Sequence, residues 1–188
     1  YTDKDASEKK ILRNVFKDGD AWFNTGDLIK TVDVGFAFGK EHYQFVDRVG
    51  DTFRWRSENV STNEVGEILN GFMDVNMSNV YGVEVPGCEG RAGMAAFSLE
   101  DVKNFNWNAF SEHVENNLPK YARPVFIRII QEMDTTGTFK LKKNELRDES
   151  FDLNKVNDMV YCLKPSSNSY ELLDRDWLDK INSCEAGY

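Results

Sequence analysis

Residues 52–72 read TFRWRSENVSTNEVGEILNGF and combine the signals of a β-hairpin with those of a capped helix. Polar and apolar side chains alternate over residues 52–56 as in a strand, and residues 58–60 are placed to return as its partner. Ser61 and Glu64 form a capping box, in which Ser61 caps a helix and Glu64 reaches back to its start. The apolar side chains of that helix recur on one face, at Val65, Ile68, Leu69 and Phe72. We therefore predict a hairpin followed by an amphipathic helix.

Further strands and a second helix follow this stretch. Residues 75–85 and 91–99 have the composition of two strands, joined by a turn that contains proline and glycine. Residues 107–118 carry apolar side chains at helical spacing and end before a proline, and residues 125–130 form another apolar run. The order ββαββαβ predicts an α/β (α+β) fold, in which a small domain contains a mixed three-stranded sheet, a β-hairpin and flanking helices.

The chain on either side of this domain has a different pattern. Residues 2–16 place apolar side chains on one helical face and predict a short amphipathic helix. Residues 21–48 contain short apolar segments separated by turn residues, which predict a small strand-rich unit. The chain begins with Tyr1 rather than methionine and enters structured-looking sequence at once, so we expect it to be a piece of a longer protein. Residues 151–188 include one helix, predicted over residues 174–181, and have no assigned role.

The composition limits the classes of function. Of the 188 residues, 40% are hydrophobic, which is enough for a packed core. The formal charge of −9 argues against nucleic acid or anionic lipid as a main binding partner. The three cysteines are odd in number and form no CxxC pair, so we expect neither a disulfide framework nor metal ligands. Because no apolar run is long enough for a signal peptide or a membrane span, we expect a soluble intracellular protein.

Three side chains in or near turns are candidates for contacts with a ligand. Lys140 follows a threonine and glycine turn that could carry its charge to an anionic group, although most lysines in such places are solvated surface residues. Asp27 directly follows a glycine and could accept hydrogen bonds from a vicinal diol such as a ribose, or cap its own turn. Arg48 lies between two carboxylates and could hold a sugar or a phosphate, or form a local ion pair.

Four segments of the chain are informative because of their order. They are TGD at residues 25–27, DRVGD at 47–51 with SENV at 57–60, LPKYARP at 118–124, and TGTFK at 136–140. Together they resemble the adenylate-forming superfamily of acyl-CoA synthetases, luciferases and peptide-synthetase adenylation domains. The sequence DRVGDTFRW at residues 47–55 is most similar to the branch of fatty acid transport proteins and very-long-chain acyl-CoA synthetases.

The resemblance implies a reaction in two halves. A carboxylic acid attacks the α-phosphate of ATP to give an acyl adenylate and pyrophosphate, and the thiol of CoA then displaces AMP to give a thioester. Thr25 and Asp27 would belong to the segment that binds ATP and AMP, with Asp27 accepting both ribose hydroxyls and Arg48 donating to the same sugar. Lys140 would contact the carboxylate and phosphate oxygens during adenylation, where its charge offsets the negative charge of the transition state.

The resemblance also implies a rotation of the small domain about a hinge at Gly50 and Asp51. This rotation would exchange Lys140 for the hairpin. Residues of the hairpin would then line the path of the CoA pantetheine: Arg56, Ser57, Glu58 and Asn59. Two of them depart from the superfamily pattern, since Ser57 stands where most members have glycine and Asn59 where many have arginine.

The resemblance sets the expected domains and cofactors. Residues 1–48 would end the large ATP-binding domain, residues 49–165 would form the small C-terminal AMP-binding-enzyme domain, and residues 166–188 would form a tail of unknown role. A phosphate loop and an acyl tunnel are not found in the sequence. We therefore expect ATP, CoA and a fatty acid as substrates of a longer protein, Mg²⁺ bound with the ATP phosphates by its preceding part, and no activity of this chain alone.

The identity of the acid is less constrained, because its pocket would lie outside these residues. The similarity of residues 47–55 to the fatty acid transport protein branch favours a long-chain or very-long-chain fatty acid. A bile acid, a carnitine-like acid, a short acyl chain or a non-catalytic binding module stay open as alternatives. The branch includes membrane-associated proteins, so we expect a location in the cytoplasm or on the cytoplasmic face of a membrane, with peripheral attachment through the absent N-terminal region. An oligomer is also compatible with the sequence.

Overall fold

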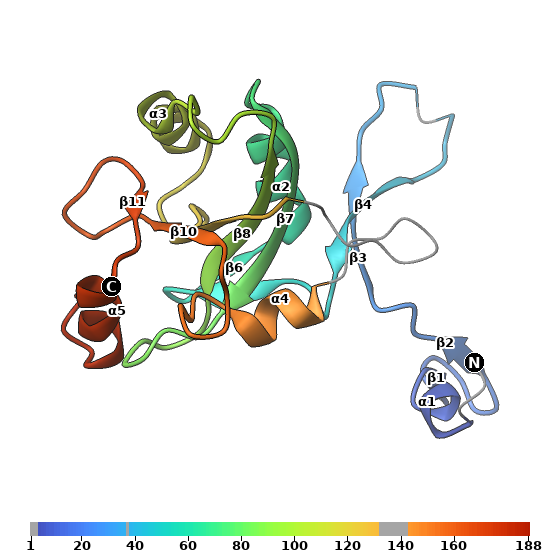
Figure 1. The fold of residues 1–188 in the computed structure, drawn as a ribbon. Coiled ribbons are helices and arrows are strands. Elements are labelled where there is room, and N and C mark those ends of the chain that lie inside the picture. The colour runs from blue at the N-terminus through green and yellow to red at the C-terminus, as the bar shows by residue number, and fades with distance from the viewer. Residues whose placement is uncertain (1–3, 37, 132–142) are drawn as a thin grey trace. The chain divides into compact units, whose positions relative to one another are not determined.

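We describe the chain in a computed structural model that covers residues 4–36, 38–131 and 143–188 (Figure 1). The chain divides into two compact units, residues 1–50 and residues 51–188, and each is described by itself. Within the described residues, no helix is both long enough and apolar enough to cross a bilayer.

Unit 1 consists of a short helix and two antiparallel hairpins. Helix α1 (Lys4–Glu8) precedes β1 (Ile11–Arg13), which pairs with β2 (Ala21–Phe23). Strand β3 (Asp27–Val32) pairs with β4 (His42–Arg48). The strand-rich character predicted for this part of the chain is confirmed.

The helix predicted over residues 2–16 is wrong beyond α1. Ile11 begins a strand that pairs with β2. The reason is the carboxylate of Asp20, which accepts hydrogen bonds from three successive backbone N–H groups, those of residues 15–17. A side chain that satisfies these donors offers the backbone an alternative to the helical ladder. The chain therefore turns back at this point, and the apolar spacing of residues 2–16 does not become a helix.

Unit 2 contains a five-stranded mixed sheet with the strand order β11-β10-β9-β8-β7. Neighbouring strands are antiparallel except β8 and β9, which are parallel. In chain order the elements are β5 (Phe53–Trp55), β6 (Glu58–Val60), α2 (Thr62–Asn70), β7 (Val75–Val83), β8 (Ala92–Leu99), α3 (Trp107–Asn117), β9 (Phe126–Ile129), α4 (Asn144–Glu149), β10 (Met159–Cys162), β11 (Glu171–Leu172) and α5 (Arg175–Asn182). The predicted mixed α/β class is confirmed.

The sheet has two strands more than the three predicted. Both additional strands, β10 and β11, come from the region to which the sequence assigned no role. Strand β10 pairs with β9, with Tyr161 opposite Ile127, so its partner lies far earlier in the chain. Strand β11 is only two residues long and pairs with the end of β10. Strands this short, with distant partners, give no local signal in the sequence.

The core of unit 2 surrounds β8. Residues 92–97 of this strand are all buried, which indicates a central strand covered on both faces. Phe97 meets Phe110 of α3 edge to face, with the ring centroids 5.3 Å apart. Leu69 of α2 is also completely buried, and α2 contacts both β7 and α3. Unit 2 therefore has a hydrophobic core of its own.

The predicted start of helix α2 is confirmed by its cap. The Ser61 hydroxyl accepts a hydrogen bond from the N–H of Glu64, at 3.3 Å. Helix α5 begins in the same way, since the Asp174 carboxylate accepts from the N–H of Trp177 at 2.7 Å. These local signals explain why the helix boundaries could be predicted.

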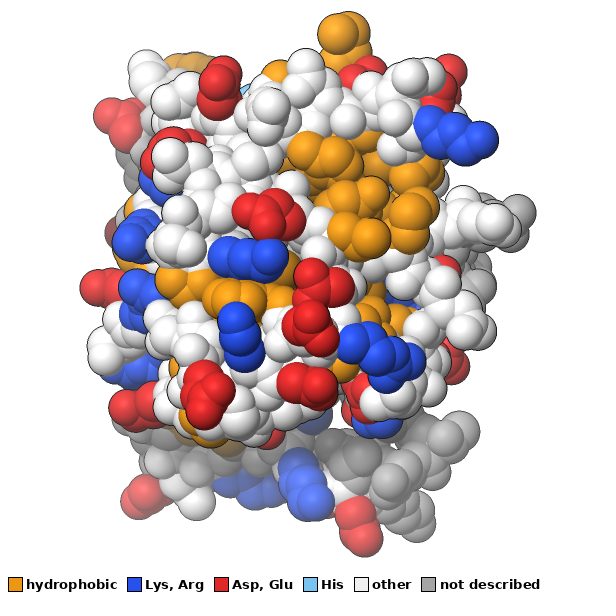
Figure 2. All heavy atoms as spheres, turned by 60° about the vertical axis from the view of Figure 1, so that its left-hand side comes forward, with side chains coloured by type: hydrophobic (Ala, Val, Ile, Leu, Met, Phe, Trp, Pro, Cys, Tyr) orange, Lys and Arg blue, Asp and Glu red, His pale blue; other side chains and the backbone are white. Residues whose placement is uncertain are grey.

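The surface of the molecule carries charges of both signs. Figure 2 shows acidic and basic side chains interspersed on the visible face, with apolar areas between them. The visible face therefore does not concentrate positive potential in the way that a nucleic-acid-binding face does.

Candidate functional site

The ends of β3 and β4 bring together three of the residues singled out in the sequence. Asp27 is the register partner of Arg48, and the Arg48 Nε lies 2.9 Å from Asp27 Oδ1. Arg48 also donates from Nη1 to the main-chain oxygen of Thr25, at 3.3 Å. The Arg48 side chain is half exposed, so the ion pair itself contributes no more than about 1 kcal/mol to stability. The arrangement places a carboxylate and a guanidinium side by side at the surface of unit 1.

The predicted hairpin of β5 and β6 is confirmed, with Phe53 opposite Val60. Its loop consists of Arg56 and Ser57, which have φ angles of 52° and 67°. Two consecutive positive φ angles are typical of a type I′ turn, the tight turn that joins twisted strands and favours glycine or asparagine. A serine at this second position adopts the left-handed conformation at a cost of roughly 1 kcal/mol. Glycine adopts a positive φ without this cost, which explains why it would suit position 57 of the same turn.

The hairpin is attached to the turn that joins β7 and β8. Trp55 forms an isolated β-bridge with Gly90, and the N–H of Arg91 donates to the main-chain oxygen of Arg54 at 2.7 Å. Trp55 is buried, whereas the four residues from Arg56 to Asn59 are exposed. The hairpin therefore has one anchored end and presents its loop to solvent.

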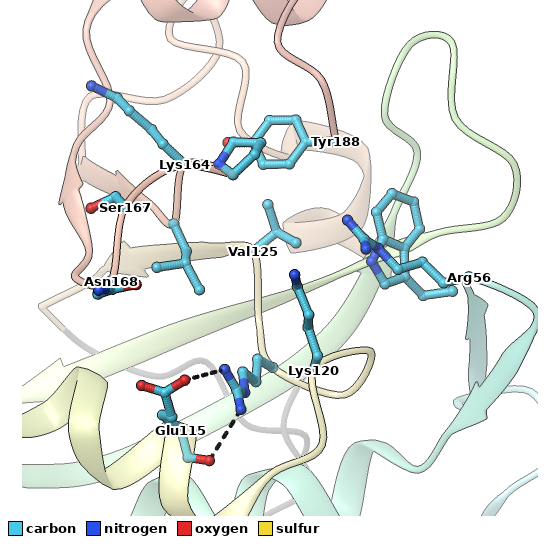
Figure 3. A pocket seen from close by; sticks show the side chains of 12 residues that line it. Arg56, Glu115, Lys120, Val125, Lys164, Ser167, Asn168 and Tyr188 are labelled. Atoms are coloured by element: carbon cyan, nitrogen blue, oxygen red, sulfur yellow. Dashed lines mark hydrogen bonds and ion pairs between the residues drawn. The ribbon is translucent and has the colours of Figure 1, made fainter.

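A cavity of about 310 Å³ opens beside the loop of the hairpin (Figure 3). This volume lies at the lower end of the range for small-ligand sites. Its charged lining side chains comprise four that are basic, Arg56, Lys120, Arg123 and Lys164, and one that is acidic, Glu115. Figure 3 shows Lys120 pointing into the cavity and Arg56 approaching from the hairpin. The cavity is thus suited to a negatively charged group.

The basic side chains of this cavity are held to different degrees. Arg123 is fixed by hydrogen bonds from Nη1 to Glu115 Oε1 at 3.0 Å and from Nε to the main-chain oxygen of Leu118 at 3.0 Å. Lys164 donates to Glu171 at 2.9 Å, and this hydrogen bond lowers the pKa of the Glu171 carboxyl. Arg123 therefore forms a preorganised wall, while much of the charge of Lys164 is engaged outside the cavity.

Ion pairs connect Asp51, at the predicted hinge, to the region of helix α4. Asp51 pairs with Arg147 at 3.1 Å and with Lys143 at 3.6 Å, and the Lys143 Nζ donates to Thr62 Oγ1 at 2.9 Å. This cluster ties α4 to the first residue of unit 2. Lys140, the predicted catalytic lysine, lies outside the described residues.

A second ion cluster holds the other end of α4. The Arg128 guanidinium on β9 contacts Glu149 and Asp158, each at 2.6 Å. Burial acts to lower the pKa of Arg128, but the hydrogen bonds from its guanidinium to these carboxylates outweigh burial and raise it. Arg128 therefore stays charged and links three segments of unit 2, a structural rather than a chemical role.

Comparison with known proteins adds to this geometry. No family model matches the chain. It is 44% identical to a medium/long-chain-fatty-acid–CoA ligase of Mycobacterium tuberculosis, over 90% of this chain and 27% of the ligase. It is 42% identical to the long-chain fatty acid transport protein 6 of Mus musculus, over 98% of this chain and 29% of that protein. The chain is a homologue of fatty acid CoA ligases and long-chain fatty acid transport proteins. The resemblance seen in the sequence is confirmed.

Solved structures agree with this homology at the level of the fold. The fatty acyl CoA synthetase of Mycobacterium tuberculosis matches with a TM-score of 0.55 and 22% identity, over 69% of this chain and 24% of the synthetase. The O-succinylbenzoate CoA synthetase of Bacillus subtilis, in complex with AMP, matches with a TM-score of 0.61 and 20% identity, over 81% and 27%. The aligned part of the chain thus shares its fold with these synthetases, and the five-stranded mixed sheet is consistent with the C-terminal domain of adenylate-forming enzymes. The chain spans less than a third of the length of the ligases and transport proteins it matches.

Sequence reasoning did not find several residues of the site in this ligase homologue. Lys120 and Arg123 lie in a segment that carried the family resemblance, but no charge pattern marked them as parts of a cavity. Lys164 and Tyr188 come from the region without an assigned role. Lys143 and Arg147 gave no signal of their contact with Asp51, because an ion pair between distant segments leaves no periodic pattern in a sequence.

Proposed function

We propose that this chain is the C-terminal portion of a long-chain or very-long-chain fatty acyl-CoA synthetase. The longer enzyme would join a fatty acid to ATP as an acyl adenylate, with release of pyrophosphate, and transfer the acyl group to CoA with release of AMP. The observation that carries the proposal is the 42–44% identity to fatty acid CoA ligases and transport proteins over nearly the whole chain.

Unit 1 would contribute the nucleotide contacts of the larger domain. Asp27 would accept hydrogen bonds from the ribose hydroxyls, and Arg48 would donate to the same sugar, next to Thr25. Their close approach at the paired ends of β3 and β4 supports these roles. Several aromatic or aliphatic side chains of this unit are at least half exposed, as expected of strands that a larger domain would cover: Trp22, Phe23, Ile29, Tyr43 and Phe45.

The hinge would lie at Gly50 and Asp51, where the chain divides into its two units. Rotation there would bring either Lys140 or the hairpin to the nucleotide. The contacts of Asp51 with Lys143 and Arg147 support this proposal, because they couple the hinge to α4, which begins shortly after Lys140. Lys140 would act in adenylation only.

Mg²⁺ would be held with the ATP phosphates by residues outside this chain. Among the described residues, no cluster of three or more His, Cys, Asp or Glu side chains is arranged to hold a metal ion. The described residues thus offer no site for the metal, and we assign them no step that involves Mg²⁺. We also assign attachment to the cytoplasmic face of a membrane and assembly into an oligomer to other parts of the longer protein.

The hairpin and the basic cavity would guide CoA during thioester formation. Arg56, Ser57, Glu58 and Asn59 would line the pantetheine path, as inferred from the resemblance. The cavity beside them supports an extension of this path, since Arg56, Lys120 and Arg123 together could hold the phosphate groups of the CoA nucleotide.

The Lys120→Met variant is expected to bind adenosine 3′,5′-bisphosphate, the phosphorylated end of CoA, about 5- to 10-fold more weakly than the parent chain. The loss of one charged hydrogen bond accounts for an effect of this size. Isothermal titration calorimetry on the 188-residue chain measures it, at two salt concentrations because the contact is screened by salt. The control is Lys103→Met, an exposed lysine that does not line the cavity. Equal losses in the two variants would contradict the assignment of the cavity.

The activity itself is tested with the longer protein that contains these residues. Purified with palmitate, ATP and CoA, it is expected to form palmitoyl-CoA and AMP, whereas residues 1–188 alone should form neither. Mass spectrometry of the acyl-CoA product, with bile acid, carnitine-like and short acids in competition, separates fatty acid ligases from the other ligases. A longer protein that activates none of these acids would contradict the proposal and favour a binding module.

A further inference from the structure

Two of the three cysteines line the same small cavity near the end of α5. This cavity has a volume of about 70 Å³ and lies between the turn at residues 85–88 and the segment 181–188. Cys88 is the last residue of that turn, and Cys184 follows α5 by two residues. Both thiols are free, and Cys184 is exposed whereas Cys88 is partly buried.

The contact between the two segments is very close. Cys184 Sγ lies 2.7 Å from the point that a Cβ on Gly87 would occupy, and Cys184 Cβ lies 2.9 Å from it. Gly87 is the immediate neighbour of Cys88, and the turn is closed by a hydrogen bond from the Cys88 N–H to the main-chain oxygen of Val85, at 3.0 Å. The absence of a side chain at Gly87 is therefore what allows Cys184 to approach the base of Cys88. The Cα atoms of a disulfide are about 4.4–6.8 Å apart, and successive Cα atoms are about 3.8 Å apart, so a contact one residue from Cys88 is compatible with a bridge.

Hydrogen bonds hold the region around both cysteines. Cys184 has a φ of 64°, in the left-handed region that residues with side chains rarely adopt. Its N–H donates to the main-chain oxygen of Ile181 at 3.0 Å, which holds it in place. Cys88 Sγ donates to the main-chain oxygen of Tyr188, at 3.6 Å. Cys184 thus belongs to the short segment that follows α5, and the Cys88 thiol contacts the end of the same segment.

The third cysteine is in a different environment. Cys162 on β10 is completely buried, and burial raises its pKa to about 11. Since the thiolate is the reactive form, Cys162 is a poor competitor in thiol exchange.

We propose that Cys88 and Cys184 form a reversible disulfide, which goes beyond the ligase activity and does not depend on it. The oxidant is a small-molecule disulfide such as glutathione disulfide. The exposed Cys184 thiolate attacks one sulfur of glutathione disulfide, forming a mixed disulfide and releasing one glutathione thiolate. The Cys88 thiolate then attacks Cys184 Sγ and releases the second glutathione. Two protein thiols are oxidised and two glutathione thiols are formed, so electrons and protons balance.

The disulfide would join the turn at residues 85–88 to the segment that follows α5. Both are connected to the basic cavity. The turn before Gly90 leads into the main-chain contact between Arg91 and Arg54 of the hairpin. Tyr188, four residues after Cys184, lines both the small cavity and the basic cavity. Oxidation would thus link the segment that carries Tyr188 covalently to the turn at residues 85–88.

Oxidation of the 188-residue chain with glutathione disulfide tests this proposal. Peptide mapping under non-reducing conditions is expected to show a Cys88–Cys184 cross-link. The Tm should rise by roughly 5–10 °C, because the bridge closes a long loop, and dithiothreitol should reverse the rise. Cys88→Ser and Cys184→Ser should each abolish the cross-link and the rise in Tm, and Cys162→Ala should retain both.

Two results would overturn the inference. One is the recovery of Cys88 and Cys184 only as separate mixed disulfides with glutathione. The other is a rise in Tm that persists in Cys184→Ser, which would assign the stabilisation to a different modification. If Cys162→Ala does not fold, the oxidised native chain is alkylated under denaturing conditions and mapped without reduction, and Cys162 should then be recovered alkylated while Cys88 and Cys184 are recovered as one cross-linked peptide pair.

Discussion

Replacing Lys140 with alanine in the longer protein is expected to slow acyl-adenylate formation by on the order of 10²- to 10³-fold. In the proposed mechanism this ammonium group neutralises charge that develops on the carboxylate and the α-phosphate, a contact made more strongly in the transition state than in the ground state. Thioester formation from a preformed acyl adenylate should be retained, because the hairpin replaces Lys140 in that step. Single-turnover assays of each half reaction measure the two effects.

The control for this experiment is Lys103→Ala, which removes an exposed lysine of unit 2 and should leave both half reactions unchanged. Equal losses of both half reactions in Lys140→Ala would contradict the role given to Lys140. A variant that adenylates at the normal rate would contradict it more directly. Either result would concern the role of Lys140 alone, because the experiment changes only that residue. The assignment to the ligase family would not be affected.

The parts of the fold that could be predicted are those with local causes. The hairpin of β5 and β6, the cap of α2 at Ser61 and the buried run of β8 each depend on residues within one short stretch. Strand β10 could not be predicted in the same way, because its partner β9 lies far away in the sequence. The helix predicted over residues 2–16 failed because a single carboxylate, Asp20, captured backbone donors that the apolar pattern could not take into account.

The candidate site shows the same division. Asp27 and Arg48 come together because the register of one hairpin sets them opposite each other. From their types alone, a sugar contact was one interpretation beside a turn cap or a local ion pair. The basic cavity is different, since its lining comes from the hairpin, from α3 and the segment between α3 and β9, and from residues on either side of β11. Such a cavity is a product of tertiary packing, and no linear motif encodes it. The family could be recognised from the sequence, whereas the charged wall beside the proposed CoA path required the structure.

The Gly90→Ala variant is expected to destabilise unit 2 by about 3–5 kcal/mol. A Cβ at this position would lie 2.3 Å from the main-chain oxygen of Arg54, and the backbone of Gly90 has a φ of 86°. Since the clash is with backbone rather than with a flexible side chain, it can be relieved only by moving the hairpin. The hydrogen bond from the Arg91 N–H to Arg54 would then be lost. Urea unfolding of the 188-residue chain, followed by circular dichroism, measures the change.

Gly187→Ala separates the steric effect from the effect of a positive φ. Gly187 has a φ of 76°, but nothing lies within 4 Å of a Cβ placed on it, so the loss should be only about 1–2 kcal/mol. Equal losses at the two glycines would show that conformational strain alone matters and that the hairpin is not held by close contact. In the longer enzyme, Gly90→Ala should reduce thioester formation more than adenylation, because the displaced hairpin serves only the second half reaction in the proposed mechanism. The same substitution thus tests whether the anchored end of the hairpin is what positions its exposed loop.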